Sequence, residues 1–479
     1  MKKVVIIGGG ITGLAAAYTV QGKARETGAA IDYLLVERDN RLGGKILTEN
    51  IDGFTVEAGP DSFLAEKPYV GQWASKVGIE DRLMCSNEAS KRTFVLADGR
   101  LHELPEGLMG LVPTKIVPFA LSPLITWPGK FRMALDFVLP KKKNDEDETL
   151  GSFVRRRLGQ EALDKIAEPL IGGIHAGDPD RMSLKATFPR FLEMEKNYGS
   201  LMRAMLAGRR KAPAAPKKPA AGKPNKTFFM TFEGGMADLS DAIAARLDPK
   251  KILTGQEVSS IEKLTGPEGR TKYIVHIDGM EPVEADAVVV TAPSHDSAKM
   301  LKKVDATISE KLAEIPFATS ATVSIAYRRS DLKKPIEAFG LVIPISEKRK
   351  IKAVTYSSTK WNNRTPGDDY VLMRAFVGGA RNQELVTLSD EEMIKMVRQE
   401  LKDIMNLDAD PVMIKIYRWI NGMPQYVLGH LERVTAVEAR SAKIPGLYLA
   451  GGSYRAVGIG DCADAGAKAA EKAVEYLIS

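Results

Sequence analysis

The chain opens on an apolar run that ends in a cluster of glycines. Residues 2–7, KKVVII, are nearly all apolar and β-branched, as is typical of a parallel strand buried on both faces. The glycines of GGGITG follow directly, and LAAAYTV after them has the composition of a buried helix. A second strand pattern, IDYLLVE, ends at Glu37. This succession predicts the strand, turn, helix and parallel strand that begin a Rossmann-type fold.

The region from about 300 to 428 alternates strand and helix patterns. Its strands, ATVSIAYRR, FGLVIPI, IKAVTYSS and YVLMRAFVGG, are interrupted by DEEMIKMVRQELKDIM, which has the period of an amphipathic helix. These patterns predict a mixed sheet that forms one wall of a cavity. Residues from about 80 to 206 have a mainly helical pattern.

An apolar stretch at 107–129, GLMGLVPTKIVPFALSPLITWPG, carries a proline at every fifth position. The prolines rule out a regular spanning helix. We expect short helices that cap the substrate cavity, with a shallow membrane-contacting patch as the alternative. The chain otherwise lacks the pattern of a membrane span or a signal peptide, so the expected location is the cytoplasm. The apolar residues that we expect to be buried are Leu111, Ile116, Phe119, Leu121, Leu124 and Trp127.

Composition adds a linker and argues against a metal. The net charge of +7 is modest for 479 residues, and part of it lies in GRRKAPAAPKKPAAGKPNK at 208–226. Such a segment cannot bury apolar surface, so 207–226 is predicted to be an extended linker in preference to a nucleic-acid-binding arm. Cys85 and Cys462 are far apart, and the five histidines lack metal-ligand spacing. We expect no metal site.

The glycines and Glu37 together indicate a dinucleotide site. Glycine at the first position of GxGxxG allows a tight turn, at the second it lets the backbone approach a pyrophosphate, and at the third it lets the helix pack against the strand. Glu37, at the end of the second strand, is placed to accept hydrogen bonds from an adenosine ribose. The alternative is an ordinary helix-capping glycine run and a surface glutamate.

Further segments favour FAD over NAD. RDNRLGGK is a second glycine turn with cations beside it, EAGPDSF follows, and the C-terminal GLYLAGGSYRAVGIGDC leads into an alanine-rich helix that suits a flavin ring. Both ends of the chain would then build one site. The prediction is an α/β protein with a discontinuous Rossmann-type FAD-binding domain at 1–78, 227–299 and 429–479, a mainly helical cap domain at 79–206 and a mixed-sheet substrate-binding domain at 300–428.

These motifs resemble the flavoprotein superfamily of amine oxidases, phytoene desaturases and protoporphyrinogen-type oxidases. EAGPDSFL, EPLIGGIHAGD, MSLKATFP, RWINGMPQYVLGH and AVGIGDC also follow the order of the bacterial, soluble protoporphyrinogen/coproporphyrinogen oxidases, nearly end to end. The glycine motifs are generic, whereas IHAGD, the TFP segment and MPQYVLGH distinguish this group from amine oxidases. The resemblance implies oxidation of a porphyrinogen to a porphyrin in haem synthesis.

The resemblance also implies individual contacts. Without it, Trp419 and Tyr356 would be interpreted as ordinary core aromatics. The implied substrate contacts are Lys67, Gly173, Ile174 and Tyr356. The implied cofactor contacts are Gly8, Gly9, Gly10, Ile11, Thr12 and Gly13 at the pyrophosphate, Glu37 at the ribose, Arg38, Gly44, Lys45, Gly59, Pro60, Asp61 and Ser62 along the cofactor, the backbone of Val258 at the adenine, and Trp419, Val457, Gly458 and Ile459 around the flavin.

The implied reaction needs no strong base or nucleophile from the protein. Hydride loss from a meso carbon between two pyrroles leaves a delocalised cation, so a strong protein base is unnecessary. Six electrons leave in three two-electron steps, and O2 reoxidises the flavin to give hydrogen peroxide. We therefore assign no catalytic residue. The FAD is expected to be non-covalent, because Cys462 follows a GxG turn and does not lie in a GGC context.

Two other functions stay open at this point. The same scaffold serves amine oxidases and carotenoid desaturases, and a non-catalytic flavin-binding protein that docks other enzymes belongs to a different class. Coproporphyrinogen III is favoured over protoporphyrinogen IX, because the chain resembles the soluble oxidases and because a cationic chain suits a tetra-anionic substrate. The expected partners are the porphyrinogen, O2 and ferrochelatase, with membrane contact at most peripheral.

Overall fold

The computed structural model describes residues 1–479 except 110, 212–226, 266–270 and 456. Its first sheet is parallel and joins three distant parts of the chain in the order β12-β2-β1-β16-β22. The prediction that both ends of the chain contribute to one Rossmann-type sheet is therefore confirmed. The strands are β1 (Lys2–Ile7), β2 (Ile31–Val36), β12 (Ile252–Leu253), β16 (Ala287–Val290) and β22 (Leu447–Leu449).

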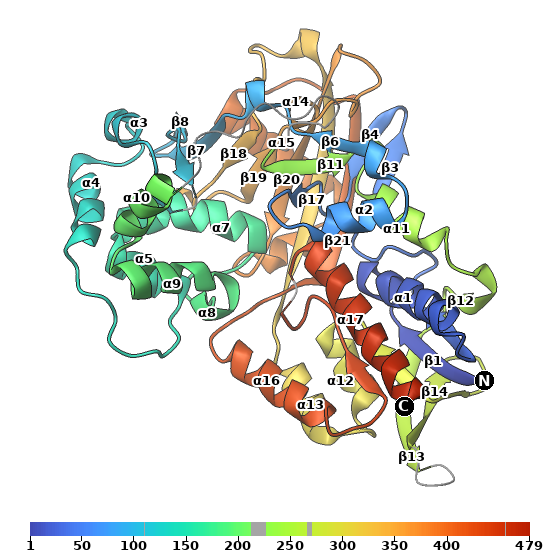
Figure 1. Ribbon diagram of the computed structural model, residues 1–479. Coiled ribbons are helices and arrows are strands. Elements are labelled where there is room, and N and C mark those ends of the chain that lie inside the picture. Colours follow the sequence, from blue (N-terminus) through green and yellow to red (C-terminus); the bar gives the residue numbers. More distant parts are fainter. Residues whose placement is uncertain (110, 212–226, 266–270, 456) are drawn as a thin grey trace.

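Helices and a small sheet cover both faces of this parallel sheet. Along β1, Val4 and Ile6 enter the core on one face and Val5 and Ile7 enter the core on the other, which explains why the strand has no polar alternation. α1 and α17 pack side by side on the first face (Figure 1). Around the first core lie α1 (Ile11–Thr27), α2 (Tyr69–Lys76), α11 (Ala237–Ala244) and α17 (Ile459–Ile478). Around the second lie β13 (Val258–Thr265), β14 (Thr271–Ile277), β15 (Val283–Ala285), α12 (Ser294–Leu301), α13 (Ala306–Ala313) and α16 (His430–Ser441).

A seven-stranded mixed sheet forms the second layer, in the order β21-β17-β20-β19-β18-β7-β8. The long helix α15 (Asp390–Met405) covers one face, and the hairpin of β3 (Thr48–Ile51) and β4 (Phe54–Glu57) packs on the other. The predicted strands and the predicted helix of 300–428 are confirmed. The strands are β7 (Thr93–Ala97), β8 (Arg100–Glu103), β17 (Phe317–Arg328), β18 (Gly340–Val342), β19 (Ile351–Thr355), β20 (Tyr370–Gly378) and β21 (Met413–Pro424).

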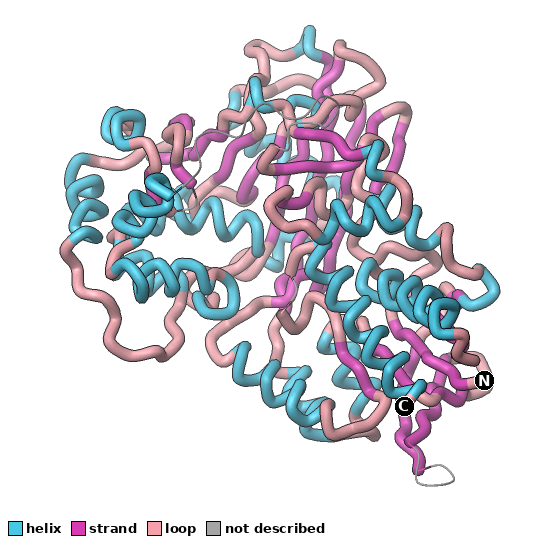
Figure 2. Tube along the Cα trace, viewed as in Figure 1, coloured by secondary structure: helices cyan, strands magenta, loops and turns pink. Residues whose placement is uncertain are grey.

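A group of helices with a core of its own stands beside this sheet, on the opposite side from α1 and α17 (Figure 2). A small sheet of β5 (Phe63–Leu64), β11 (Phe229–Phe232) and β6 (Leu83–Cys85) packs against the first core of the parallel sheet. No helix in the described part of the chain is long and apolar enough to cross a bilayer. The helices of the group are α3 (Ile116–Leu121), α4 (Trp127–Ala134), α5 (Leu150–Arg157), α7 (Glu168–His175), α8 (Leu184–Thr187), α9 (Pro189–Tyr198) and α10 (Leu201–Lys211).

Two boundaries differ from the sequence prediction. The predicted cap domain at 79–206 contains β7 and β8, which extend the substrate sheet, because Asp98 and Gly99 both take positive φ angles and form a hairpin turn. The predicted linker begins too early, because α10 continues through Lys211 and the first proline, which would end a helix, comes at Pro213. The remaining linker residues, 212–226, lie outside the described residues.

The proline-rich stretch at 107–129 is only half buried. Leu111, Phe119 and Leu124 enter the helical core as expected. The expectation that Ile116, Leu121 and Trp127 are buried is wrong, since these side chains are between 62% and 77% exposed. Each of these helices packs one face on the helical core, through Phe119 of α3 and Met133 of α4, and leaves its other face in solvent.

Candidate functional site

The first glycine turn joins β1 to α1 at the carboxyl edge of the parallel sheet. Gly10 is the N-cap of α1 and provides no side chain to cap the helix, so the first N–H groups of the helix need an acceptor from elsewhere. Gly8 has a φ of 105°, and a Cβ there would lie 2.8 Å from Thr291 Oγ1. A Cβ at Gly13 would overlap the carbonyl oxygen of Gly8. The turn is thus a backbone cradle with an unsatisfied helix terminus, which suits a pyrophosphate.

A second glycine turn packs directly on the first. The backbone N–H of Gly43 donates to the carbonyl oxygen of Gly9 at 2.9 Å, and a Cβ at Gly44 would lie 3.1 Å from the Cα of Gly10. Gly59 in turn packs on the backbone of Lys45, whose carbonyl oxygen a Cβ at Gly59 would overlap. The segments that the sequence pattern placed along one cofactor are therefore brought together here.

Glu37 lies beside the first turn, 8% exposed. Its carboxylate accepts from the backbone N–H of Gly9 at 2.5 Å and from that of Asp39 at 2.8 Å, which fixes it next to the cradle with lone pairs to spare. The backbone of Glu37 pairs with Leu253 and Gln256, so Val258 lies at the same end of the site. The neighbouring Arg38 instead forms an ion pair with Asp296 at 3.0 Å.

The C-terminal helix α17 brings a further uncapped N-terminus. Gly458 is its N-cap and offers no side-chain bond, and a Cβ at Gly466 would overlap the carbonyl oxygen of Thr12 in α1. The two helices can thus approach closely only through glycine. Asp461, in the first turn of α17, forms an ion pair with Lys67 at 2.6 Å. Lys67, one of the substrate candidates, therefore lies beside the N-terminus of α17.

The MPQYVLGH motif holds the loop that leads into α17. Tyr426 and His430 stack with their ring centroids 3.9 Å apart. The hydroxyl of Tyr426 donates to the carbonyl oxygen of Gly452 at 2.8 Å, and His430 Nε2 donates to that of Tyr454 at 2.7 Å. Burial lowers the pKa of His430, which keeps the ring neutral. Tyr426, ahead of α16, and His430, the first residue of α16, therefore fix the approach to Val457 and Ile459.

Side chains of the mixed sheet form hydrogen bonds with the backbone of residues 57–59. Arg374 Nη1 donates to the carbonyl oxygens of Glu57 and Gly59 at 3.1 and 2.6 Å. Trp419 Nε1 donates to that of Ala58 at 2.9 Å, and Thr322 Oγ1 donates to the same oxygen at 2.9 Å. The backbone carbonyl groups of residues 57, 58 and 59 therefore all accept hydrogen bonds from side chains on one face of the mixed sheet. These side chains come from β20, β21 and β17. This contact places Trp419 beside the Gly59 turn.

Sequence reasoning missed two cations in this region. Asp61 forms ion pairs with Lys360 at 3.2 Å and with Arg374 at 3.7 Å, and Ser62 donates to Asp61 at 2.8 Å. The two cations hold the pKa of Asp61 well below its usual range despite its burial. Arg374 is the single charged residue of YVLMRAFVG, and a lone arginine in an otherwise apolar strand is the signal that could have revealed it.

The expected placement of Tyr356 in the substrate cavity is wrong. Tyr356 is 4% exposed and lies in the core between the sheet and α15, with its hydroxyl 3.4 Å from Met405 Sδ. Side chains alternate along β19, so Tyr356 shares the α15 face with Val354, while Arg374 and Trp419 lie on the opposite face. Gly173 and Ile174 belong to α7, but their side chains lie outside the described residues.

Glu57 gives the fold a pH dependence that can be measured. Its carboxyl oxygens lie 2.8 Å from the backbone nitrogen of Met236 and 2.8 Å from Thr48 Oγ1, and burial raises its pKa from 4.5 to about 7. The folded protein keeps the proton up to about pH 7 and the unfolded chain loses it near its ordinary pKa, so the free energy of unfolding falls as the pH rises between these values. The expected loss is about 2 to 3 kcal/mol.

Glu57→Gln removes this loss. Urea unfolding near pH 5 and near pH 8 should show the variant gaining about 2 to 3 kcal/mol on the parent protein between the two conditions. Equal differences at both pH values would contradict a buried, protonated Glu57.

The parallel sheet, its glycine turns and the carboxylate after its second strand define a dinucleotide-binding flavoprotein, and FAD fits the described residues. Stacked glycine backbones leave room for a pyrophosphate, and two uncapped helix termini supply N–H donors. The model for flavin containing amine oxidoreductases matches residues 11–474, and the chain belongs to this family. It is an FAD-dependent oxidoreductase.

Individual relatives align over the whole chain. Coproporphyrinogen III oxidase of Bacillus subtilis (strain 168) is 37% identical over 479 residues, covering 100% of this chain and 99% of that protein. Coproporphyrinogen III oxidase of Propionibacterium freudenreichii subsp. freudenreichii is 33% identical over 99% of this chain and 91% of that protein. The crystal structure of a protein described as a putative protoporphyrinogen oxidase, from Exiguobacterium sp. 255-15, superimposes with a TM-score of 0.85 at 32% identity over 100% of this chain and 99% of that chain.

Proposed function

We propose that this chain oxidises coproporphyrinogen III to coproporphyrin III, and protoporphyrinogen IX to protoporphyrin IX less efficiently, in haem synthesis. The observation that carries the proposal is the end-to-end match to proteins named for these reactions, at 37% and 33% identity. The preference for the coproporphyrinogen is supported by the names of those bacterial relatives and by the cationic chain.

The side chains and turns of this chain bind and orient the cofactor and the substrate. The FAD that they hold would supply the redox chemistry, two electrons per step, with O2 as the acceptor that we propose. The glycine turns and Glu37 hold the nucleotide, while Arg374, Trp419 and Thr322 fix the 57–59 turn beside it. A porphyrinogen needs no strong base, so we assign none. Ferrochelatase is the partner that we propose for the product, because a porphyrin is the substrate that it metallates.

Turnover with several substrates tests this function. Coproporphyrinogen III should give porphyrin fluorescence with three O2 consumed per porphyrin, whereas an amine or a carotenoid precursor should give no turnover. Oxidation of an amine would favour the amine oxidase alternative, and FAD binding without any turnover would favour a non-catalytic docking protein.

We propose that the FAD is held non-covalently. Burial raises the pKa of the Cys462 thiol to about 11, so the thiolate needed for a thioether is scarce at neutral pH. Acid precipitation of the purified protein should leave the yellow colour in the supernatant. Colour that stays with the pellet would contradict the proposal.

We also propose peripheral contact with a membrane through α3, α4 and the residues that follow α4. The helices α3 and α4 lie at the outer edge of the helical region in Figure 1. The apolar side chains of this patch are between 48% and 77% exposed. Lys130 lies 4.5 Å from the centre of the Trp127 ring, and aromatic rings next to lysines suit the surface of an anionic bilayer. The patch consists of Ile116, Val117, Leu121, Trp127, Phe131, Leu135 and Val138.

Vesicle co-sedimentation tests this contact. Trp127→Ser together with Phe131→Ser should weaken binding to anionic phospholipid vesicles about tenfold, because these two rings are the largest side chains of the patch and lie more than 60% exposed. Val412→Ser, at an exposed valine far from the patch, is the matched control and should bind like the parent. Failure of the parent protein to bind vesicles would contradict the proposal.

A further inference from the structure

A buried group of charged side chains lies behind the turn at 57–62. The carboxylate of Asp61 forms ion pairs with Lys360 Nζ at 3.2 Å and with Arg374 Nη2 at 3.7 Å. The three side chains are only 5% to 14% exposed. Lys360 is the last residue of α14 (Ser357–Lys360) and Arg374 belongs to β20, so two separate elements direct a cation to one carboxylate.

One carboxylate does not balance two cations. The carboxyl group of Glu57 forms its hydrogen bonds elsewhere, and because burial raises its pKa to about 7 it adds no charge below that pH. Arg364 is buried nearby, and Asp238 offsets its charge. Within the described part of the chain, Arg374 Nε is buried without a hydrogen-bond partner. The group around Asp61 therefore carries a surplus of one positive charge.

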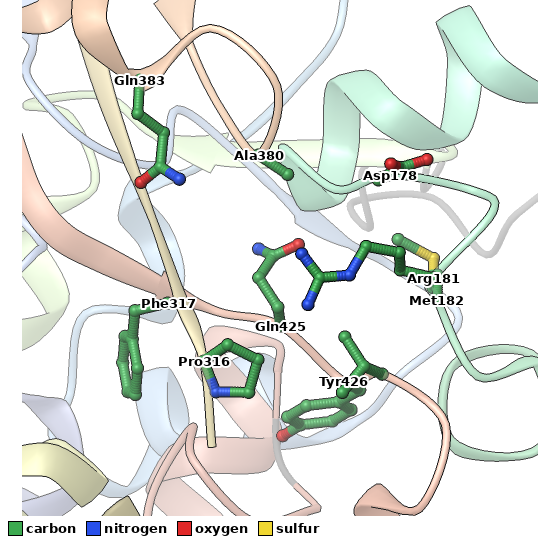
Figure 3. Close-up of a pocket in the computed structure, with 10 residues that line it drawn as sticks. Asp178, Arg181, Met182, Pro316, Phe317, Ala380, Gln383, Gln425 and Tyr426 are labelled. Atoms are coloured by element: carbon green, nitrogen blue, oxygen red, sulfur yellow. The ribbon is translucent and has the colours of Figure 1, made fainter. Parts of the chain in front are cut away.

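Burial distinguishes this surplus from charges at the surface. In the open pocket of Figure 3, Arg181 is exposed to solvent and Asp178 already has a guanidinium partner at 2.6 Å. Water and counter-ions screen such groups. The ammonium of Lys360 instead lies 4.7 Å from the ring centre of Phe229 and 4.9 Å from that of Trp361. A charge enclosed in this way acts over a longer distance.

The segment that begins with this turn runs along the whole candidate cofactor site. Gly59 packs on the backbone of Lys45 in the second glycine turn, which in turn contacts the first. Further along the same segment, Lys67 forms an ion pair with Asp461 in the first turn of α17. The turn therefore lies between the cradle for the pyrophosphate and the second uncapped helix N-terminus.

Reduction adds negative charge to a flavin. One step takes two electrons and two protons from the porphyrinogen. The flavin gains both electrons and one of the protons, and therefore one negative charge, while the other proton goes to water. O2 later takes up the two electrons with that proton and one proton from water as hydrogen peroxide, which removes the charge again. A fixed cation near the ring favours the reduced form, because the oxidised ring is neutral.

We propose that the surplus positive charge of Lys360 and Arg374 over Asp61 raises the reduction potential of an FAD whose ring lies beside the turn at 57–62. This inference rests on the proposed function and adds Lys360 to the residues that support the reaction. Lys360 acts through its electric field and exchanges no proton with the substrate. Asp61 acts in the opposite direction, because it limits the size of the surplus.

The midpoint potential of the FAD in the purified holoprotein tests the inference, measured without O2 against a reference dye at about pH 6, where Glu57 is neutral. Lys360→Met should lower the potential and Asp61→Asn should raise it. Each shift should be about 30 mV, which is a tenfold change in the equilibrium constant of a two-electron couple. The double variant has the net charge of the parent and should return to the potential of the parent, and Lys360→Arg should also match the parent.

Lys402→Met is the matched control. Lys402 is an exposed lysine of α15 that forms an ion pair with Asp408 at 2.9 Å, so its replacement removes the same charge at the surface and should leave the potential unchanged. Damage to the turn alone would shift Lys360→Met and Asp61→Asn in the same direction. Shifts of the same sign in these two variants therefore overturn the inference.

The test does not depend on one variant. If Lys360→Met does not retain FAD, the comparison of Asp61→Asn with the double variant decides, and equal potentials for these two overturn the inference. A parent protein that oxidises porphyrinogens while its variants share one potential overturns this inference alone. A parent protein that binds FAD and oxidises no porphyrinogen overturns the proposed function, and the potentials can still be compared.

Discussion

Replacing Gly13 by alanine is expected to give a protein that does not retain FAD. The new Cβ would overlap the carbonyl oxygen of Gly8, which is backbone and cannot turn away. Either α1 moves off the sheet or the first glycine turn opens, and both changes destroy the cradle. Overpacking of this kind costs about 3 kcal/mol or more, which corresponds to a loss of FAD affinity of about a hundredfold.

The matched control lies in the same helix. Gly22 of α1 has no atom within 4 Å of an added Cβ, so Gly22→Ala should keep its FAD and gain about 0.5 to 1 kcal/mol of stability. FAD titration of the two apoproteins and urea unfolding measure both effects. Equal FAD affinity for Gly13→Ala and Gly22→Ala would show that close packing at Gly13 is not required for binding.

Replacing Arg374 by methionine is expected to destabilise the protein by about 3 to 5 kcal/mol and to release FAD. The side chain is 4% exposed and supplies the donors for two backbone carbonyls and one of the two cations for Asp61. Its loss leaves buried acceptors without partners, which is the costly way to break such a network. Arg374→Lys should recover only part, because one ammonium cannot reproduce the guanidinium geometry.

Arg328→Met is the control for Arg374→Met. Arg328 ends the neighbouring strand β17, is exposed, and contacts the ring of Tyr370 at 5.9 Å. Its replacement should change the unfolding free energy by about 0.5 kcal/mol at most. Denaturant midpoints and the FAD retained through gel filtration distinguish the variants. A midpoint for Arg374→Met equal to that of Arg328→Met would contradict the role of the arginine as an anchor.

Local patterns predicted the elements of the fold well. The run KKVVII is a strand buried on both faces, and DEEMIKMVRQELKDIM coincides with α15. The order of the strands could not be predicted from local patterns, because β7 and β8 join the mixed sheet from a distant part of the chain. The Asp98-Gly99 turn was a local signal for that hairpin, but no local signal says which sheet a hairpin extends.

Some residues of the candidate site could be predicted from local patterns and others could not. The glycine turn was predictable, because only glycine tolerates the close contacts at Gly8 and Gly13. Tyr356 was placed in the substrate cavity by the resemblance alone, whereas the interpretation from the residues, an ordinary core aromatic, agrees with its position in the core under α15. Arg374 contacts Gly59 across a gap of several hundred residues, which composition and spacing do not encode.

Mixing the purified holoprotein with coproporphyrinogen III in the absence of O2 tests the central claim most directly. The account predicts that the absorbance of the oxidised flavin disappears on mixing and returns when O2 is admitted, with porphyrin fluorescence growing over successive cycles. It also predicts no bleaching by an amine under the same conditions. An oxidised flavin band that coproporphyrinogen III leaves unchanged, and that an amine bleaches, would contradict the assignment of a porphyrinogen as the substrate.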